Sequence, residues 1–290
     1  MQFSLLLICL AAISWGTTGT SLVLLNRTAD IHPMLVGFWR MALASPLLLL
    51  WAGKTLRPGQ LSVRQWQLLL GMGACIASYQ VCYFCAVPLA GVAVTALVAI
   101  CSSPVLIALM AALLLGERLT RWVYLSLGLG VAGTALLVLG PGAVTASTGF
   151  LWGVLLAFGA ALSYAGYAVI AKVALGGISP VAIAAYGFTT AALLLTPILG
   201  LQPAWPNFVP ALPWLLYLGL VTTGIAYGIY MLGIRHTSAT VAGIAVLLEP
   251  LTATLIGVGL FKEAIGGVGW LGGGLLLGAI AILVIHQQRE

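Results

Sequence analysis

Charged side chains are scarce in this chain of 290 residues: Asp, Glu, Lys and Arg together make up 6%, against about 25% in an ordinary soluble domain. Hydrophobic residues account for 62% of the chain, and its mean hydropathy is +1.17. So few polar side chains cannot cover a surface that faces water, and so apolar a chain is not expected to stay disordered. The composition therefore excludes a soluble globular protein and indicates a protein surrounded mostly by lipid.

Residue types that carry catalysis or hold metals are also scarce within the apolar stretches. The three histidines lie at segment ends, and the five cysteines lie in apolar surroundings that disfavour charged thiolates. Cys82 and Cys85 have the spacing of a redox motif, but no alternation of strands and helices surrounds them. Glu249 is the one acidic residue at membrane depth, so no pair of catalytic carboxylates is available. We therefore expect no catalytic residue, no enzyme activity, no bound metal and no cofactor.

The basic residues do not indicate a nucleic-acid partner, although the formal net charge is +6. They are scattered between the apolar stretches and never form a run or patch. Residues 128–133 spell the dinucleotide-binding fingerprint, but they interrupt an apolar helix and follow no strand, so we interpret them as a place of close helix packing. The expected partners are a lipid bilayer and a small-molecule substrate, and we expect a functional monomer.

Ten apolar segments alternate with short polar or proline-bearing stretches. A helix needs about 20 apolar residues to span a bilayer, so each segment is long enough for about one span. Proline suits the first turn of a helix and cannot continue a helical interior unaided, which helps to place the starts. The expected transmembrane helices are residues 3–25, 33–51, 65–87, 92–115, 122–139, 150–173, 180–199, 212–233, 239–261 and 267–285.

The basic residues between these segments favour one orientation in the membrane. With the N-terminus in the cytoplasm, only Arg27 and Lys262 fall in outer loops. Loops enriched in Lys and Arg stay in the cytoplasm, so both termini are expected on that side. The basic residues of the expected inner loops are Lys54, Arg57, Arg64, Arg118, Arg121, Lys172, Arg235 and Arg289.

The sequence also contains an internal repeat. Residues 93–117 align without gaps on residues 239–263, and this alignment pairs the intrahelical Pro104 with Pro250. The same alignment places Glu117, at the end of the first copy, on Glu263 at the end of the second.

Two halves of five helices each follow from this repeat, over residues 1–143 and 144–290. Because five is odd, the second half must enter the membrane with the opposite orientation, as in the inverted repeats of secondary transporters. The expected fold is an all-α integral membrane protein with ten transmembrane helices in two inverted five-helix repeats. Such halves can rock about a site at the midplane and give alternating access.

Four motifs carry a resemblance to a known family. They are Trp15 in the first segment, Phe38-Trp39-Arg40-Met41-Ala42 in the second, Ser103-Pro104 followed by Leu115-Gly116-Glu117-Arg118-Leu119-Thr120, and Leu248-Glu249-Pro250 in the ninth. Together they resemble the EamA-type branch of the drug/metabolite transporter superfamily over the whole chain, and within it the chain is similar to the YddG group of bacterial amino-acid exporters. The resemblance implies ten helices in the bacterial inner membrane, a central cavity between the halves, and efflux of small metabolites. The second repeat departs from the motif, with Lys262-Glu263-Ala264 in place of Gly-Glu-Arg.

Polar and aromatic side chains at mid-depth are the candidates to face a substrate, because polarity buried in lipid usually points to a cavity or another helix. For Glu249, a proton-linked or substrate-sensing role and a packing role both stay open, and its repeat partner is Ser103. Arg40 is expected to reach the interface along its own stem, in preference to binding a carboxylate. Occurrence in both repeats favours cavity lining slightly over ordinary packing for the aromatic residues. The predicted substrate-binding residues are Trp15, Thr18, Tyr79, Tyr83, Ser102, Ser103, Tyr164, Tyr167, Tyr227, Tyr230 and Glu249, with helix kinks at Pro104 and Pro250.

The main functional interpretation is a secondary transporter that exports amino acids, preferably hydrophobic or aromatic ones, or related small metabolites. The nearer alternative is a drug or other metabolite carrier of the same superfamily. Nucleotide sugars fit less well, because their phosphates require several cationic side chains and Arg40 is the only one inside the membrane. A passive channel and an intramembrane enzyme are the alternatives from other classes.

Overall fold

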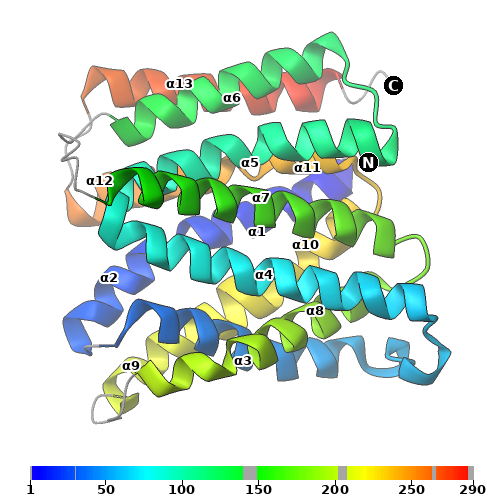
Figure 1. Cartoon of the computed structure of the whole chain (residues 1–290). Coiled ribbons are helices and arrows are strands. Elements are labelled where there is room, and N and C mark those ends of the chain that lie inside the picture. The colour runs from blue at the N-terminus through cyan, green and yellow to red at the C-terminus, as the bar shows by residue number, and fades with distance from the viewer. Residues whose placement is uncertain (1, 30, 140–148, 202–207, 263–265, 287–290) are drawn as a thin grey trace.

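The computed structural model describes residues 2–29, 31–139, 149–201, 208–262 and 266–286, and every regular element in these ranges is helical. Figure 1 shows the elements in chain order. In the first half they are α1 (Gln2–Gly16), α2 (Thr18–Thr28), α3 (Pro33–Ala52), η1 (Gly53–Thr55), η2 (Pro58–Gln60), α4 (Val63–Ala90), α5 (Val92–Leu115) and α6 (Arg121–Leu139). In the second half they are α7 (Phe150–Ala174), α8 (Pro180–Leu195), η3 (Thr196–Leu201), α9 (Phe208–Leu216), η4 (Tyr217–Ile225), α10 (Ala226–Ile234), α11 (Ala239–Ala245), α12 (Leu248–Phe261) and α13 (Gly267–His286).

All ten apolar segments of the sequence are helical, and eight of the described helical segments are long and apolar enough to cross a membrane. The other two segments correspond to α6, which has 19 residues, and to α13, whose apolar stretch Gly267–Leu283 is shorter than the eight. The structure therefore supports a multi-pass membrane protein, whereas the count of ten spans stays a prediction.

Two of the predicted helices are interrupted near their middle. The first breaks at Thr17, between α1 and α2, and the ninth breaks at residues 246–247, between α11 and α12. Pro250 has no N–H for the carbonyl of Val246, and this carbonyl accepts a bond of 2.9 Å from the backbone N–H of Glu249 instead. The break therefore lies one turn before the proline.

The predicted kink at Pro104 is not accompanied by a break in the helix, and whether the helix bends there stays a prediction. α5 runs as one helix from Val92 to Leu115 with Pro104 inside it, so the two aligned prolines have different local structures. A proline removes one hydrogen bond of a helix, and neighbouring helices in a membrane protein can compensate for that loss. Here α5 is packed against α6, α7 and α11, which hold it along its length.

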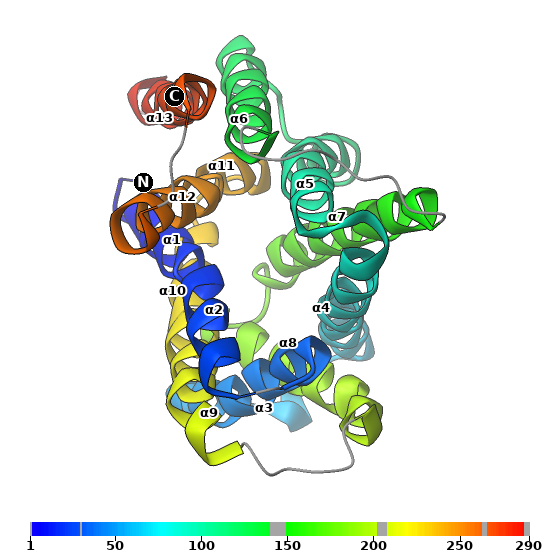
Figure 2. The same ribbon diagram turned by 90° about the vertical axis from the view of Figure 1, so that its left-hand side faces the viewer.

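The helices form two groups that face each other, as the view along them shows (Figure 2). In one group α7 packs against both α4 and α5, and in the other α1 packs against both α10 and α12. The pair α3 and α8 closes one side between the groups, and the pair α6 and α13 packs together on the opposite side (Figure 2). The interior of the protein therefore lies between the facing surfaces of these two groups of helices.

The two ends of the helix assembly carry different numbers of basic residues. α1 begins and α13 ends on the same side of the molecule (Figure 1, right), and the α3–α4, α5–α6, α7–α8 and α10–α11 connections lie on that side too. We call this side the basic face. Its described basic residues are Lys54, Arg57, Arg64, Arg118, Arg121, Lys172 and Arg235, whereas Arg27 and Lys262 lie toward the opposite end. Arg289 lies outside the described residues.

Close helix packing at the dinucleotide-like motif involves only some of its glycines. A Cβ atom at Gly133 would lie 2.7 Å from the carbonyl oxygen of Gly272, so this glycine allows α6 to approach α13. At Gly128 no atom lies within 4 Å of the same position. Gly266, just before α13, and Gly278 within it are open in the same way.

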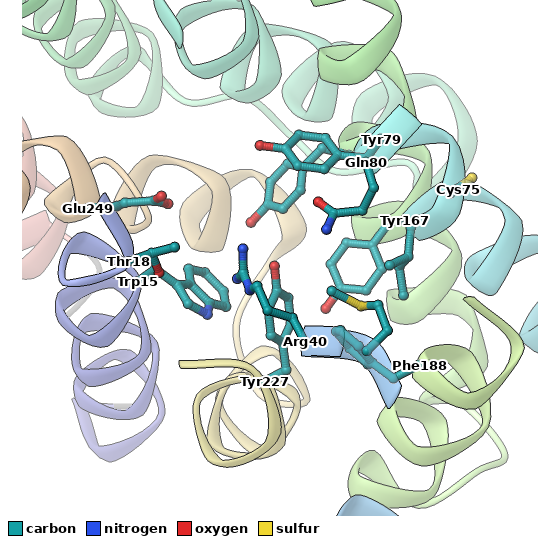
Figure 3. Close-up of a pocket in the computed structure, with 13 residues that line it drawn as sticks. Trp15, Thr18, Arg40, Cys75, Tyr79, Gln80, Tyr167, Phe188, Tyr227 and Glu249 are labelled. Carbon is teal, nitrogen blue, oxygen red and sulfur yellow. The ribbon is translucent and has the colours of Figure 1, made fainter. Parts of the chain in front are cut away.

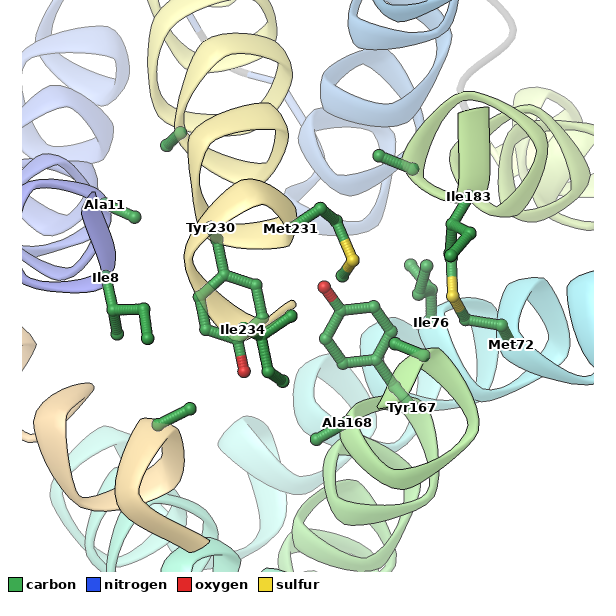
Figure 4. Packing of buried hydrophobic residues seen from close by; sticks show 14 of the residues in the cluster. Ile8, Ala11, Met72, Ile76, Tyr167, Ala168, Ile183, Tyr230, Met231 and Ile234 are labelled. Carbon is green, nitrogen blue, oxygen red and sulfur yellow. The ribbon is translucent and has the colours of Figure 1, made fainter. Parts of the chain in front are cut away.

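A dense apolar cluster fills the interior toward the basic face (Figure 4). Tyr167 and Tyr230 are the largest side chains that are almost fully buried, and their rings lie 6.5 Å apart in a stacked arrangement. Met231, Ile234 and Ile183 surround them. The interior is therefore sealed on the side of the basic face by packed side chains, as in a well-packed protein core.

Candidate functional site

A cavity lies between the two groups of helices (Figure 3), and its lining includes Trp15 near the end of α1 and Glu249 near the start of α12. It contains about 650 Å³ of empty space, a figure that includes the space at its open side. Side chains from eight helices line it: Trp15, Thr18, Arg40, Met41, Cys75, Ile76, Tyr79, Gln80, Tyr164, Tyr167, Phe188, Tyr227 and Glu249.

Aromatic rings form much of the cavity wall. The ring of Tyr227 lies 4.5 Å from that of Trp15 and 4.6 Å from that of Phe188, measured between centroids. Tyr164 continues this chain of contacts, since its ring lies 5.7 Å from that of Tyr167 and 6.1 Å from that of Tyr79. Aromatic rings at these distances attract each other, so the wall is pre-formed. It offers a large flat surface to an apolar ligand.

The sequence around Trp15 explains how α1 comes close to α12. A Cβ atom at Gly16 would lie 2.5 Å from the Cβ of Thr252 and 2.8 Å from the carbonyl oxygen of Glu249. Only glycine fits at that distance, so Gly16 allows α1 to pack directly on the first turn of α12. This contact places Trp15 and Glu249 on the same side of the cavity (Figure 3).

Arg40 extends from α3 into the middle of the cavity (Figure 3). Its Nε donates a hydrogen bond of 3.2 Å to the hydroxyl of Thr223, and this hydroxyl in turn donates to the carbonyl of Leu218 at 2.8 Å. Thr223 belongs to η4, which is π-helical, and the bond to Leu218 spans five residues instead of four. A π-helical turn shifts the direction of the side chains that follow it, and here it supports the guanidinium group.

Glu249 points into the same space from α12 (Figure 3). Its carboxyl group interacts electrostatically with Arg40, but no ion pair or hydrogen bond joins the two side chains among the described residues. The cavity therefore presents one cationic and one acidic side chain that share no hydrogen bond or ion pair with each other. Charges at this depth are costly, so such groups generally mark a functional site.

Several further polar atoms of the cavity wall are buried without a hydrogen-bond partner in the described structure. They are Nε1 of Trp15, Oγ1 of Thr18, Nε2 of Gln80 and the hydroxyls of Tyr164 and Tyr167. Most buried polar groups in proteins are hydrogen-bonded, so a set of this kind around one cavity indicates a place for a polar ligand or for water.

The structure brings seven of the eleven predicted substrate-binding residues to the cavity wall. They are Trp15, Thr18, Tyr79, Tyr164, Tyr167, Tyr227 and Glu249. These residues come from both halves of the chain, as the repeat predicts, but their contact with a substrate stays a proposal.

Four predicted residues do not line the cavity. Ser103 is buried in α5 and donates its hydroxyl to the carbonyl of Ala99 at 2.7 Å, and Ser102 on the same helix is also absent from the wall. Tyr83 lies one turn beyond Tyr79 and stacks against it at 5.7 Å. Tyr230 is fully buried in the apolar cluster below Trp15. The expected meeting of Ser103 with Glu249 at the centre is therefore not found.

Several residues of the cavity wall were not predicted, or were predicted to point elsewhere. Arg40 was expected to reach the membrane interface, whereas its side chain turns inward and bonds Thr223. Gln80 was not predicted as a wall residue. Its amide side chain in the middle of an apolar helix indicates an inward-facing position and could have identified it. Four other wall residues are apolar, as most residues of membrane helices are, and nothing in the sequence marks them as cavity residues. They are Met41, Cys75, Ile76 and Phe188.

A network of hydrogen bonds closes the basic face below the cavity. The carboxyl oxygens of Glu117 accept bonds from the backbone N–H of Ala239 at 2.6 Å and from the N–H and hydroxyl of Thr240 at 3.1 and 2.7 Å. Lys172 donates to the carbonyls of Ile234 and Thr237 at 2.8 and 2.7 Å. Glu117 and Lys172 belong to the α4–α5–α7 group, and the segment 234–240 belongs to the other group. We call these contacts the basic-face latch.

Local structure explains why Glu117 is placed for this contact. Gly116 adopts a left-handed conformation with φ of +68°, and the backbone N–H of Glu117 bonds the carbonyl of Ala111 at 3.2 Å. This is the glycine-capped end of a helix, in which a residue with a side chain would be strained. Lys262 takes the equivalent conformation at the end of α12, with φ of +58°, and Glu263 lies outside the described residues.

No group of three or more His, Cys, Asp or Glu side chains in the described part of the chain could hold a metal ion. The five cysteines, including Cys82 and Cys85, are free thiols. The site is therefore defined by its cavity, its aromatic wall and its two charged side chains.

Comparisons with known proteins agree with this architecture. The model of the EamA-like transporter family matches residues 2–139 and 151–285. The uncharacterized transporter YwfM of Bacillus subtilis is 33% identical over 288 residues, which cover 98% of this chain and 95% of that protein. An uncharacterized transporter of Archaeoglobus fulgidus is 28% identical over 58% of this chain and 59% of its own length.

A solved crystal structure shares the fold. It superposes with a TM-score of 0.84 at 24% sequence identity and covers 99% of this chain and 98% of that chain. The two family matches together span almost all of the sequence, and the helical structure agrees with them. The chain therefore belongs to the EamA-like transporter family, within the drug/metabolite transporter superfamily, and is a membrane transporter of that type.

Proposed function

We propose that this protein is a secondary transporter of the bacterial inner membrane that exports amino acids, with hydrophobic and aromatic ones favoured, or related small metabolites. The observation that carries the proposal is the cavity between the two groups of helices, which combines an extended aromatic wall with one cationic and one anionic side chain. This combination suits a small amphipathic molecule with both apolar and charged parts.

The inverted repeat is part of this proposal, with halves at residues 1–143 and 144–290 and ten transmembrane helices. Its support comes from the helix contacts. Each predicted transmembrane helix of one half corresponds to the helix five positions away in the other half. Under this correspondence the α4–α7 contact matches the α1–α10 contact, and the α5–α7 contact matches the α1–α12 contact. The same correspondence pairs α3 with α8 and α6 with α13. In each of these two pairs the helices pack on each other. The two separate family matches, one in each half, also support a duplication.

Alternating access follows from the same arrangement. In this conformation the apolar cluster and the basic-face latch seal the cavity from the basic face. Rocking of the α4–α5–α7 group against the α1–α10–α12 group would break the latch and expose the cavity on that side. Each group would move as a unit, because its helices pack closely on one another.

The basic face is the cytoplasmic face in this proposal, because loops rich in Lys and Arg stay in the cytoplasm. We predict that a periplasm-active phosphatase fused after Gly59 is inactive and that the same enzyme fused after Gly149 is active. Enzyme activity per amount of fusion protein in intact bacteria is the measurement. The reverse pattern would contradict both the orientation and the export direction.

Export is tested first in cells. Cells that express the protein and are loaded with phenylalanine or leucine are expected to lose them faster than cells without it. Trp15→Ala and Tyr164→Ala are expected to change the relative rates for aromatic and aliphatic amino acids, because each removes a ring from the cavity wall while the variants still insert. Efflux of labelled amino acids, normalised to the protein in the membrane, is the readout.

Two results would count against this proposal. Equal efflux with and without the protein would remove amino acids as substrates and favour another metabolite or a drug. Unchanged selectivity in well-expressed Trp15→Ala and Tyr164→Ala would remove these residues from the substrate path.

A further inference from the structure

We propose that the cavity binds α-amino acids in their dipolar form, with the carboxylate held by Arg40, the ammonium group held by Glu249, and the side chain against the rings of Phe188 and Tyr227. This inference rests on the proposed function and adds the chemical class and the orientation of the substrate. It predicts that a molecule with only one of the two charges is a poor substrate.

The geometry of Arg40 suits a carboxylate. Only its Nε is engaged in the described structure, through the bond of 3.2 Å to Thr223. This bond fixes the plane of the guanidinium group and leaves the two terminal nitrogens directed into the cavity (Figure 3). A guanidinium group held in this way can form two parallel hydrogen bonds with a carboxylate, which gives both strength and orientation.

A neutral donor lies beside the Arg40 position. Gln80 is 5% exposed, its Nε2 has no hydrogen-bond partner in the described structure, and its amide points into the space that Arg40 reaches (Figure 3). A buried amide donor without a partner costs free energy, and a substrate carboxylate would satisfy it. Gln80 and Arg40 therefore offer donors to the same anion from α4 and α3, which belong to different parts of the helix assembly.

Glu249 is the proposed partner of the positively charged ammonium group of the substrate. No hydrogen bond to its carboxyl group is found among the described residues, and Thr18, whose hydroxyl is buried without a partner, lines the same cavity. Both groups can accept hydrogen bonds, and an ammonium group offers three donors. The carboxyl group of Glu249 and the Thr18 hydroxyl therefore offer the cavity acceptors for a substrate amine.

Charge balance explains why both substrate charges are needed. Burying one unpaired charge in a dry site is far more costly than burying a paired one. A dipolar substrate pairs both Arg40 and Glu249, whereas an amine leaves Arg40 without an anion and an N-acylated acid leaves Glu249 without a cation. The remaining surface, formed by Phe188, Tyr227 and their neighbours, is apolar and receives the side chain.

Uptake into proteoliposomes by the purified full-length protein tests this inference with four probes: labelled phenylalanine, phenethylamine, N-acetylphenylalanine and leucine. The wild-type protein is expected to transport phenylalanine and leucine at least ten-fold faster than the two probes with one charge. Arg40→Gln is expected to lower phenylalanine transport at least ten-fold and to raise the ratio of phenethylamine to phenylalanine. Glu249→Gln is expected to lower it similarly and to raise the ratio of N-acetylphenylalanine to phenylalanine.

The ratios separate a binding role from a structural one. Arg118→Gln is the matched control, because it removes a positive charge from an exposed loop and leaves the cavity intact. The inference would be overturned if the ratio of each singly charged probe to phenylalanine stayed at the wild-type value in both Arg40→Gln and Glu249→Gln, even with lower rates. The proposed function would still stand in that case. Wild-type protein that transports neither phenylalanine nor leucine would instead remove amino acids from the proposed function, on which this inference rests.

Discussion

Replacing Glu117 by glutamine is expected to open the basic face and to raise the reactivity of a cysteine at position 107 about ten-fold or more. Ile107 is fully buried in α5 and contacts Gly243 of α11 just above the latch. A water-soluble maleimide reaches such a position only when α5 and α11 separate. The measurement is the labelling rate of Ile107→Cys in a background without the five native cysteines.

The size of this effect follows from the hydrogen bonds of Glu117. Its two carboxyl oxygens accept three bonds from Ala239 and Thr240, and these are charge-assisted. Glutamine keeps the shape but places an amide donor against a backbone N–H, so at least one bond is lost together with the charge. A loss of about 2 kcal/mol, within the range for bonds to charged groups, would change the opening equilibrium about thirty-fold.

The control is Arg118→Gln, which changes the charge of the neighbouring residue in the same loop and leaves the three bonds of Glu117 intact. Its labelling rate is expected to equal that of the parent. If Glu117→Gln also labels at the parent rate, the latch does not hold the basic face closed, and the mechanism of access must be sought elsewhere.

Replacing Gly16 by alanine is expected to reduce transport strongly, whereas the same change at Gly19 is expected to have no effect. The two glycines lie one turn apart at the junction of α1 and α2. A methyl group at Gly16 would overlap Thr252 and the carbonyl of Glu249, but no atom lies within 4 Å of the same position at Gly19. Overpacking of this kind costs about 1–3 kcal/mol and moves the neighbouring helix.

The expected displacement involves α12, so Glu249 would move with respect to Trp15 and the cavity would change shape. Transport by Gly16→Ala is therefore expected to fall at least ten-fold while the protein still inserts and purifies as the wild type does. Thermal stability of the two purified variants provides the second measurement. Equal transport and stability for Gly16→Ala and Gly19→Ala would mean that α1 and α12 are not in close contact during the cycle.

The helical segments could be predicted from the sequence because hydropathy and proline placement determine them directly. α5 begins at Val92 and ends at Leu115 as expected, and α3 begins at Pro33. The interruptions could not be placed in this way. The break at Thr17 and the π-helical turn of η4 involve residues that would also fit a regular apolar helix, and tertiary contacts decide their conformation.

The cavity could be predicted only in part, because a helix face is known from spacing but its neighbours are not. Trp15 and Thr18 were both predicted to face a substrate, and both line the cavity, while their contact with a substrate stays a prediction. Arg40 could not be assigned, since a long side chain at that depth can turn outward to the interface or inward to Thr223. Ser103 was placed by repeat symmetry, and the continuous α5 removes that symmetry locally.

Counterflow in proteoliposomes tests most directly whether this protein is an alternating-access carrier for amino acids. Vesicles that contain the purified protein and a high internal concentration of unlabelled phenylalanine are placed in a trace of labelled phenylalanine, and internal label is followed with time. We predict a transient accumulation of label above the external concentration, which saturates with external phenylalanine and is absent from vesicles without protein. Label that never exceeds the external concentration, or uptake that rises linearly without saturation, would contradict a carrier and indicate a pore or an inactive protein.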